Sequence, residues 1–392
     1  MDTGGKIVKN VILRAPLLTM SGYGVHSRQV FRWLETKNVK ITSQCLPWGI
    51  TPWYVNSDMI DGLVGRIMAT AAPINGKADI SFQVQLPNEW DTNIAHINIG
   101  ITAAVETDKC NPKWAAACNK MDKIIVPSQF TKSCLTNSGN ITTEIEVIPE
   151  AFFECLEEES NEKVLDLDFS TDFNFLIFGQ VTGHNPYSDR KNTFFMLKWM
   201  CEEFKDNPDV GIVIKTNNGR NSTSDRTLTS NMLGKLLSEV RKGPYPKVYM
   251  LHGALEQEEI QSVYQNKKIK ALVSATRGEG YGLPLLEASV CGLPVMATNF
   301  SGHLDFLNKG KFISFNYNLS PVHPSRIDGE IFVQGSRWAE VDEKDFKSKL
   351  RKFYKSPQKP KEWAKELSST LKSEYSQTAI NKLYSNYFSK VL

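Results

Sequence analysis

The sequence predicts an α/β protein made of two doubly wound domains, each with a parallel sheet covered by helices on both faces. The chain of 392 residues is too long for one compact core, since domains commonly hold roughly 100 to 200 residues. Short apolar runs alternate with amphipathic stretches in both halves, which is typical of strands and their covering helices. An acidic stretch without periodicity, residues 150–169, separates the two series. We therefore expect two domains that face a cleft.

The first half begins with an apolar run and a loop, and the alternation then continues to about residue 126. Strands are expected at 7–13, 39–45, 80–85, 94–103 and 123–126, and helices at 25–37 and 112–121. Strands connected through helices favour parallel pairing.

The second half repeats this rhythm and ends in a helical tail. Strands are expected at 173–178, 210–215, 248–251, 270–273 and 295–298, and helices at 192–205, 230–241, 257–264 and 284–291. The tail from residue 344 has a helical pattern with breaks at Pro357 and Pro360. The predicted domains are residues 1–165 and 166–375, followed by a C-terminal helix at 376–392.

The bulk composition is that of an ordinary globular protein, with 41% hydrophobic and 23% charged residues. No apolar run approaches the ~18 residues that a membrane-spanning helix needs, and the N-terminus lacks the apolar segment of a secretory signal. The seven cysteines are scattered and form no CxxC pair, which favours free thiols in a reducing compartment. A cytoplasmic protein without a transmembrane segment is expected.

The C-terminal segment is basic, because residues 344–392 hold 12 Lys and Arg against 4 Asp and Glu. A solvated helical face explains such a bias most simply. The alternative is an anionic partner, either a charged surface or a nucleic acid.

The stretch at 271–305 carries the densest chemical signal, because an apolar strand leads into a glycine-rich turn and then a short helix. The turn glycines allow backbone N–H groups to approach a ligand closely. A helix that begins near Pro284, at the carboxyl end of a strand, directs its free N–H groups toward an anion. Glu279 in the turn and Glu287 in the helix add two carboxylates, which accept hydrogen bonds from paired hydroxyl groups.

This stretch resembles the E-x7-E signature of retaining glycosyltransferases of the GT-B fold, and glycosyltransferase family 4 is the nearest group. The resemblance is carried by a short run of residues: Glu279, Gly280, Tyr281, Gly282, Leu283, Pro284, Glu287 and Ala288. It implies two Rossmann-like domains, in which Glu279 holds hydroxyls of the donor sugar and Glu287 holds the nucleotide ribose. The backbone of residues 280–283 would contact the sugar and the diphosphate, and the C-terminal helix would cross back to the first domain.

The resemblance implies further site residues in the second half. The turn at 179–183 leads to Arg190 and Lys191 at a helix start, where family members place a basic pair against the diphosphate. Fixed positive charges there would stabilise the charge that grows on a leaving phosphate. His252 lies in a loop that resembles the one beside the nucleotide base.

In the first half, Gly22 and Gly24 precede a helix and resemble the glycine loop that approaches the donor phosphates; Tyr23 and His26 are their neighbours. Ser128 follows a strand that resembles a closing strand of the family's first domain, and we count it as a donor-binding position.

Glu106 marks a departure from the family, because many relatives place a histidine in this region beside the reacting sugar. Glu106 either takes part in catalysis by orienting the acceptor or caps the helix expected after Pro112. Both interpretations stay open at this point, as does a catalytic role of His26.

The resemblance implies a retaining hexosyltransferase that uses a nucleotide diphosphate sugar such as UDP-glucose or GDP-mannose. No cofactor and no metal are expected, since no His/Cys cluster has metal-ligand spacing and the only Asp-x-Asp, at 166–168, lies in the acidic linker. The acceptor stays unidentified: a glycan, a lipid, a protein or a nucleic-acid base.

The residues support other interpretations less well. Paired carboxylates also serve glycoside hydrolases, but there they flank the scissile bond. The pattern at Gly22 and Gly24 approximates a dinucleotide fingerprint, but it lacks the third glycine and the ribose-binding acid. The runner-up is a non-catalytic two-domain protein that binds a nucleotide sugar or an oligosaccharide.

Overall fold

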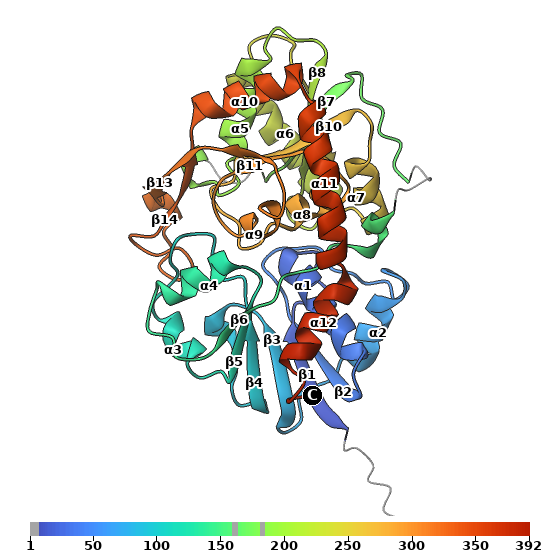
Figure 1. Ribbon diagram of the computed structural model, residues 1–392, viewed down its shortest axis with the longest axis vertical. Coiled ribbons are helices and arrows are strands. Elements are labelled where there is room, and N and C mark those ends of the chain that lie inside the picture. Colours follow the sequence, from blue (N-terminus) through green and yellow to red (C-terminus); the bar gives the residue numbers. More distant parts are fainter. Residues whose placement is uncertain (1–7, 159–163, 181–184) are drawn as a thin grey trace, which may run out of the picture. The chain divides into compact units, whose positions relative to one another are not determined.

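The computed structural model describes residues 8–158, 164–180 and 185–392, shown as the coloured ribbon in Figure 1. The described chain divides into two compact units. The start of the expected strand at residue 7 lies outside the described residues.

The first unit comprises the chain up to Ala104 together with Pro112–Ala151 and Gln377–Leu392, and the second comprises Val105–Asn111 and Phe152–Ser376. The sequence places the domain boundary at residue 165. In the structure the boundary comes earlier because Phe152 already packs in a hydrophobic core of the second unit.

A six-stranded parallel sheet forms the centre of the first unit. Its strands, in spatial order, are β2 (Val39–Cys45), β1 (Lys9–Ala15), β3 (Ala78–Val84), β4 (Ala95–Ile101), β5 (Lys123–Val126) and β6 (Ile145–Val147). All neighbouring strands pair in parallel, with Val11 opposite Ile80 where β1 meets β3. The strand runs are mostly apolar because both faces of a parallel sheet are covered.

The helices of the first unit are α1 (Gly22–Glu35), α2 (Leu63–Thr70), α3 (Trp114–Cys118), α4 (Gln129–Thr136) and α12 (Gln377–Tyr387). In Figure 1 the red α12 lies beside the blue α1, although the two helices come from opposite ends of the chain. Side chains of the last segment, Tyr384 and Phe388, pack against Trp33 of α1 and complete this core.

The second unit contains another six-stranded parallel sheet. Its strands, in spatial order, are β12 (Ile313–Phe315), β11 (Val295–Thr298), β10 (Ile269–Ser274), β7 (Phe173–Phe178), β8 (Val210–Thr216) and β9 (Lys247–His252). The strand order reverses between β7 and β10, which are neighbours although they are far apart in sequence. In open α/β sheets the carboxyl ends of the strands at such a switch point are where ligands bind.

The helices of the second unit are α5 (Thr193–Glu203), α6 (Thr223–Val240), α7 (Gln257–Tyr264), α8 (Leu283–Val290), α9 (Leu304–Leu307), α10 (Glu343–Lys355) and α11 (Gln358–Glu374). An antiparallel hairpin, β13 (Tyr317–Pro321) and β14 (Arg337–Val341), is added to this unit. Short 3₁₀ helices occupy Pro87–Glu89, Glu154–Glu157, Pro186–Ser188 and Pro324–Arg326.

The two parallel sheets with their helices confirm the predicted α/β class and the two Rossmann-like domains. The predicted break at Pro360 is wrong: Pro360 lies in the first turn of α11, where its missing N–H has no partner to lose. The helix expected at 112–121 is only the short α3, and α6 begins at Thr223 rather than Ser230. Ser222 and Asp225 form a capping box there, which starts α6 early.

No helix within the described ranges is long and apolar enough to cross a membrane.

Candidate functional site

The predicted catalytic residues of the second half gather at the switch point of the second sheet. Arg190 and Lys191 follow β7, and Glu279 follows the neighbouring strand β10. The parallel sheet therefore brings two segments nearly 90 residues apart in sequence to the same edge. Of the predicted turn at 179–183, residues 181–183 lie outside the described residues.

Glu279 is held by both cations of the basic pair. Its Oε1 lies 2.7 Å from Lys191 Nζ and its Oε2 lies 3.0 Å from Arg190 Nη1. The residue is only 7% exposed, and its own N–H donates to Ser301 Oγ at 2.8 Å. Burial alone would raise the pKa of this carboxyl, but Lys191 and Arg190 more than offset it and lower the pKa to about 2. Glu279 is therefore an ionised carboxylate fixed in place.

Arg190 also contacts Glu106, which belongs to the second unit. Arg190 Nε lies 3.3 Å from Glu106 Oε1, and Nη1 donates to the carbonyl oxygen of Gly278 at 2.8 Å. Burial opposes the charge on Arg190, but Glu106 and Glu279 raise its pKa above the usual value. Of the two interpretations left open for Glu106, helix capping is not what the structure shows, because α3 has Lys113 as its N-cap.

Asp189 shapes the segment that carries the basic pair, and sequence reasoning missed this role. Its carboxylate accepts the N–H of Lys191 at 3.0 Å and the N–H of Thr193 at 2.6 Å. Asn192 between them adopts a left-handed conformation, with φ 57°. These contacts turn the chain from the loop into α5 and fix the positions of the Arg190 and Lys191 backbone.

Glu287 is buried in α8, at 4% exposure, and its pKa is shifted in the opposite direction from that of Glu279. Its Oε2 accepts a hydrogen bond from Tyr264 Oη at 2.8 Å, and the Tyr264 ring stacks on Phe178. Burial raises the pKa of Glu287 to about 8, against the smaller opposing effect of the Tyr264 hydrogen bond. Tyr264 lies on a different helix and was not found from the sequence, where nothing distinguishes it from a core tyrosine.

The glycine turn, residues 278–282, is tightly packed at its first residue and left-handed at its last. A Cβ on Gly278 would lie 2.0 Å from the carbonyl oxygen of Glu106, so only glycine fits there. Gly282 has φ 102° and precedes α8, with Pro284 in the first helical turn. Tyr281 is buried, and its ring packs on Phe306 in the core of the second unit.

Gly280 and Leu283, also predicted to bind the donor, lie in this same turn and at the first residue of α8. Leu283 is partly buried against the core of the second unit.

His252 ends β9 in the second unit, away from the ion pairs of Glu279. Its Nε2 is buried and has no hydrogen-bond partner among the described residues. Burial and the nearby Lys215 lower the pKa of the imidazole, so the ring is neutral at pH 7.

The predicted positions of the first half belong to the first unit. Gly24 packs so closely that a Cβ would lie 2.1 Å from the Thr19 carbonyl oxygen, whereas Gly22 borders open space. Ser128 is buried and caps α4, accepting the N–H of Thr131 at 3.1 Å. Gly24 and Ser128 thus have structural roles in this unit, and Gly22 leaves room for a ligand.

His26 is buried next to the C-terminal helix. Its Nε2 lies 3.3 Å from Tyr384 Oη and its Nδ1 lies 3.8 Å from Glu150 Oε1. Burial lowers the pKa of His26 to about 4, so the ring is neutral at pH 7. Its neighbour Tyr23 stacks on Trp48 at 3.8 Å.

No group of three or more His, Cys, Asp or Glu side chains in the described parts of the chain could hold a metal ion.

Part of the basic C-terminal segment is neutralised by acidic side chains of α5. Lys347 Nζ pairs with Glu202 at 2.5 Å, and Arg351 makes a two-pronged contact with Glu203 at 2.6 and 2.7 Å. These pairs bind α10 to α5, which agrees with a structural role for this part of the segment.

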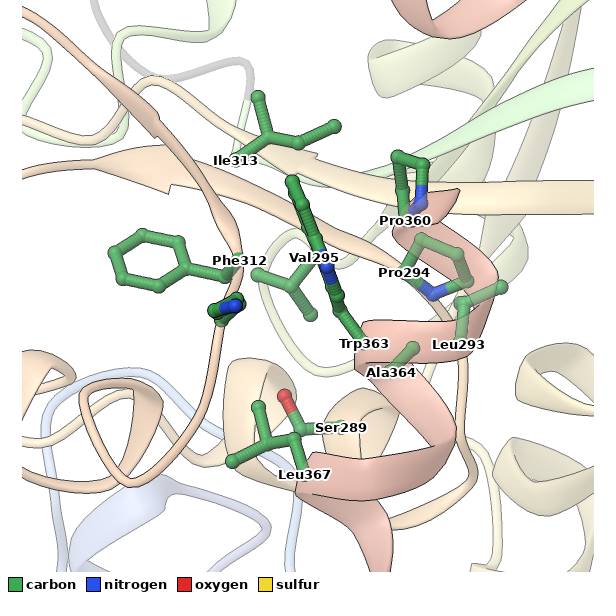
Figure 2. Close-up of a pocket in the computed structure, with 11 residues that line it drawn as sticks. Ser289, Leu293, Pro294, Val295, Phe312, Ile313, Pro360, Trp363, Ala364 and Leu367 are labelled. Carbon is green, nitrogen blue, oxygen red and sulfur yellow. The ribbon is translucent and has the colours of Figure 1, made fainter. Parts of the chain in front are cut away.

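A small apolar pocket lies on the second unit between β11, the start of β12 and α11 (Figure 2). Trp363 stands in its centre, with Val295 and Phe312 beside it and Ser289 at one side. It contains none of the predicted site residues, so we do not assign it to the site.

Residues 235–370 match the family model "Glycosyl transferases group 1". No curated protein sequence matches the chain. Among solved structures, Anabaena HepE in complex with UDP and glucose is 11% identical with a TM-score of 0.63, covering 98% of this chain and 100% of HepE.

Two further solved structures have the same fold over nearly the whole chain. Sucrose-phosphate synthase from Thermosynechococcus elongatus is 10% identical with a TM-score of 0.63, covering 98% of this chain and 99% of its own. A glycosyltransferase from Rickettsia africae is 11% identical with a TM-score of 0.64, covering 98% of both chains. The fold is that of GT-B proteins, and the family model of glycosyl transferases group 1 matches part of the second unit.

Proposed function

We propose that the protein is a retaining glycosyltransferase that moves a hexose from a nucleotide diphosphate sugar to an acceptor. The observation that carries the proposal is the buried Glu279 carboxylate, held between Arg190 and Lys191 at the start of the glycine turn. The match of residues 235–370 to glycosyl transferases group 1 includes this turn and supports the assignment. HepE, which has the same fold, is described in complex with UDP and glucose, so UDP-glucose is the first donor to test.

In this proposal the donor binds on the second unit, at the carboxyl ends of β7 and β10. The Glu279 carboxylate accepts hydrogen bonds from hydroxyls of the donor sugar, and Glu287 contacts the ribose. Backbone N–H groups of the glycine turn and the first turn of α8 face the diphosphate. Arg190 and Lys191 supply positive charge where negative charge develops.

The reaction forms a bond between the acceptor oxygen or nitrogen and the anomeric carbon on the face that the diphosphate leaves. The bond from the anomeric carbon to the diphosphate oxygen breaks, and its electron pair stays on the nucleotide diphosphate. The acceptor proton passes to the departing phosphate oxygen, so no side chain needs to act as the base. Arg190 and Lys191 stabilise the leaving charge more strongly in the transition state than in the bound donor.

We further propose that the reaction needs no metal and no cofactor, because two fixed cations already lie at the site. Full activity in the presence of EDTA is the expected result. The acceptor class, whether glycan, lipid, protein or nucleic-acid base, is to be found with an acceptor panel, and a nucleic acid would bind through residues 344–392 with strong salt dependence.

Release of nucleotide from UDP-glucose and GDP-mannose, with and without acceptors, tests the proposal. Glu279→Gln is expected to lower the rate by about 10²-fold or more, since one preorganised charged group is typically worth this much. Glu203→Gln is the matched control, because Glu203 is also a largely buried glutamate that forms a two-pronged ion pair, but it pairs with Arg351 between α5 and α10. Equal rates in the two variants would contradict the proposal, and binding without any nucleotide release would favour a non-catalytic binding protein.

A further inference from the structure

Arg277 is a buried cation that the proposed chemistry does not use. It directly precedes the glycine turn and is 0% exposed. A buried charge is stable only when it is paired and its N–H groups are satisfied. Nε and Nη2 of Arg277 donate to the two carboxylate oxygens of Glu340 in β14, at 2.6 and 3.1 Å.

The remaining donor atom of this side chain binds the segment that leads to the basic pair. Nη1 of Arg277 donates to the carbonyl oxygen of Pro186 at 3.0 Å and to that of Asp189. The guanidinium also lies over the ring of Trp338 at 5.3 Å and near the ring of Phe195 at 5.8 Å. One side chain therefore connects the β14 strand with the loop that follows β7.

Backbone hydrogen bonds follow the same connection. The N–H of Arg277 donates to the carbonyl oxygen of Arg190 at 2.9 Å, and the N–H of Ala339 donates to the carbonyl oxygen of Arg277 at 2.9 Å. Site residues lie close to these hydrogen bonds in sequence: Arg190 directly follows Asp189, and Glu279 lies two residues after Arg277. The separation between the cations and their carboxylate thus depends on where Arg277 lies.

We propose that Arg277 and Glu340 form a positioning pair that sets the distance between the Arg190 and Lys191 cations and Glu279. Through Glu340, the β13–β14 hairpin then contributes to the geometry of the site. Neither residue touches the donor in this arrangement. The inference rests on the proposed function for its catalytic consequence, while the positioning itself is a property of the second unit alone.

The ion pairs of Glu279 explain why a movement of the loop at residues 186–192 would change the reaction rate. Arg190 and Lys191 both contact Glu279 within 3.0 Å, so a movement of the loop relative to the turn breaks these contacts or strains them. A displacement of about 1 Å in a reacting group can reduce a rate about 10²-fold. An effect confined to the transition state lowers kcat and kcat/KM equally.

Glu340→Gln tests the pair, with Glu203→Gln as control for the loss of an equivalent ion pair on α5. We expect Glu340→Gln to lower kcat and kcat/KM for UDP-glucose together by ~10- to 100-fold per folded molecule, and to speed amide exchange in residues 186–192. Glu340→Asp keeps a negative charge beside the buried Arg277, so this variant should fold. Its side chain is shorter and holds the guanidinium less closely, so an intermediate rate is expected. The control variant should match the wild type in both measurements.

The proposal is overturned if folded Glu340→Gln or Glu340→Asp protein keeps the wild-type kcat and the wild-type exchange of residues 186–192. Thermal unfolding shows whether each variant folds. If Glu340→Gln does not fold, the measurements on Glu340→Asp test the proposal. If the wild type turns over neither UDP-glucose nor GDP-mannose, the proposed function fails, yet the exchange measurement still supports or contradicts the positioning pair.

Discussion

Glu279 and Glu287 lie close in sequence but have opposite charge states at neutral pH. Lys191 and Arg190 hold the pKa of Glu279 at about 2, whereas burial raises the pKa of Glu287 to about 8. The first is an obligate acceptor of hydrogen bonds. The second is mostly protonated at pH 7 and can both donate and accept. A nucleotide sugar that binds both residues would thus meet two chemically different carboxyl groups.

The raised pKa of Glu287 predicts a pH-dependent stability. Its pKa is near 4.5 in the unfolded chain and about 8 in the fold, so the folded state binds the extra proton between these values. This contribution to stability is fully present below pH 4.5 and is lost as the pH rises through 8. Glu287→Gln, which is neutral throughout, should therefore show a smaller fall in Tm than the wild type between pH 5 and pH 8.5, and parallel curves would contradict this assignment.

At the level of single residues, the sequence predicts candidate site residues through a motif but not the side chains that contact them. Glu279 was predicted to hold the donor sugar and Arg190 and Lys191 to face the diphosphate, and the structure brings both cations within 3.0 Å of the Glu279 carboxylate. Tyr264 and Arg277 were missed because a buried tyrosine or arginine has no local sequence signal. Their roles follow from packing between elements that are distant in sequence.

At the level of elements, the glycine turn is the segment that tolerates a larger side chain least. Gly278→Ala would bring a Cβ to 2.0 Å from the Glu106 carbonyl oxygen, so backbone has to move. We expect a loss of stability of about 1–3 kcal/mol and a loss of nucleotide release. Gly234→Ala is the control: this glycine lies within α6 with open space around it, and alanine there should stabilise by about 0.5–1 kcal/mol. Denaturant unfolding of both variants checks the two signs, and a stabilised Gly278→Ala would contradict the packing described.

Elements with a continuous apolar run or a clear periodic pattern were predicted well. β2, β5, β7, β11 and α7 have the bounds expected from the sequence. The hairpin of β13 and β14 was missed because β13 is polar and largely exposed and β14 is short, with charged residues among its buried ones. The hairpin is stabilised by contacts with the rest of the second unit, such as that of Arg277 with Glu340. Helices α2 and α4 were missed because they are short and their patterns are weak.

At the level of the whole molecule, the last residues of the chain complete the core of the first unit. Phe388, directly after α12, is 0% exposed and packs on Trp33 and Phe82, whereas Leu383 within α12 is 42% exposed. Phe388→Ala should lower the free energy of unfolding by about 3–5 kcal/mol. Leu383→Ala, the control, should change it by less than about 0.5 kcal/mol. Equal effects in thermal or urea unfolding would show that the segment does not seal this core.

The central claim is that Glu279 and its two cations hold a sugar attached to a nucleotide diphosphate. The most direct measurement is the Tm of the wild type, Glu279→Gln and Glu203→Gln with increasing UDP-glucose and GDP-mannose, since a ligand that binds only the folded state raises the Tm. The account predicts that at least one of these sugars raises the Tm of the wild type and of Glu203→Gln, and raises that of Glu279→Gln much less. No shift in the wild type, or equal shifts in all three proteins, would contradict it.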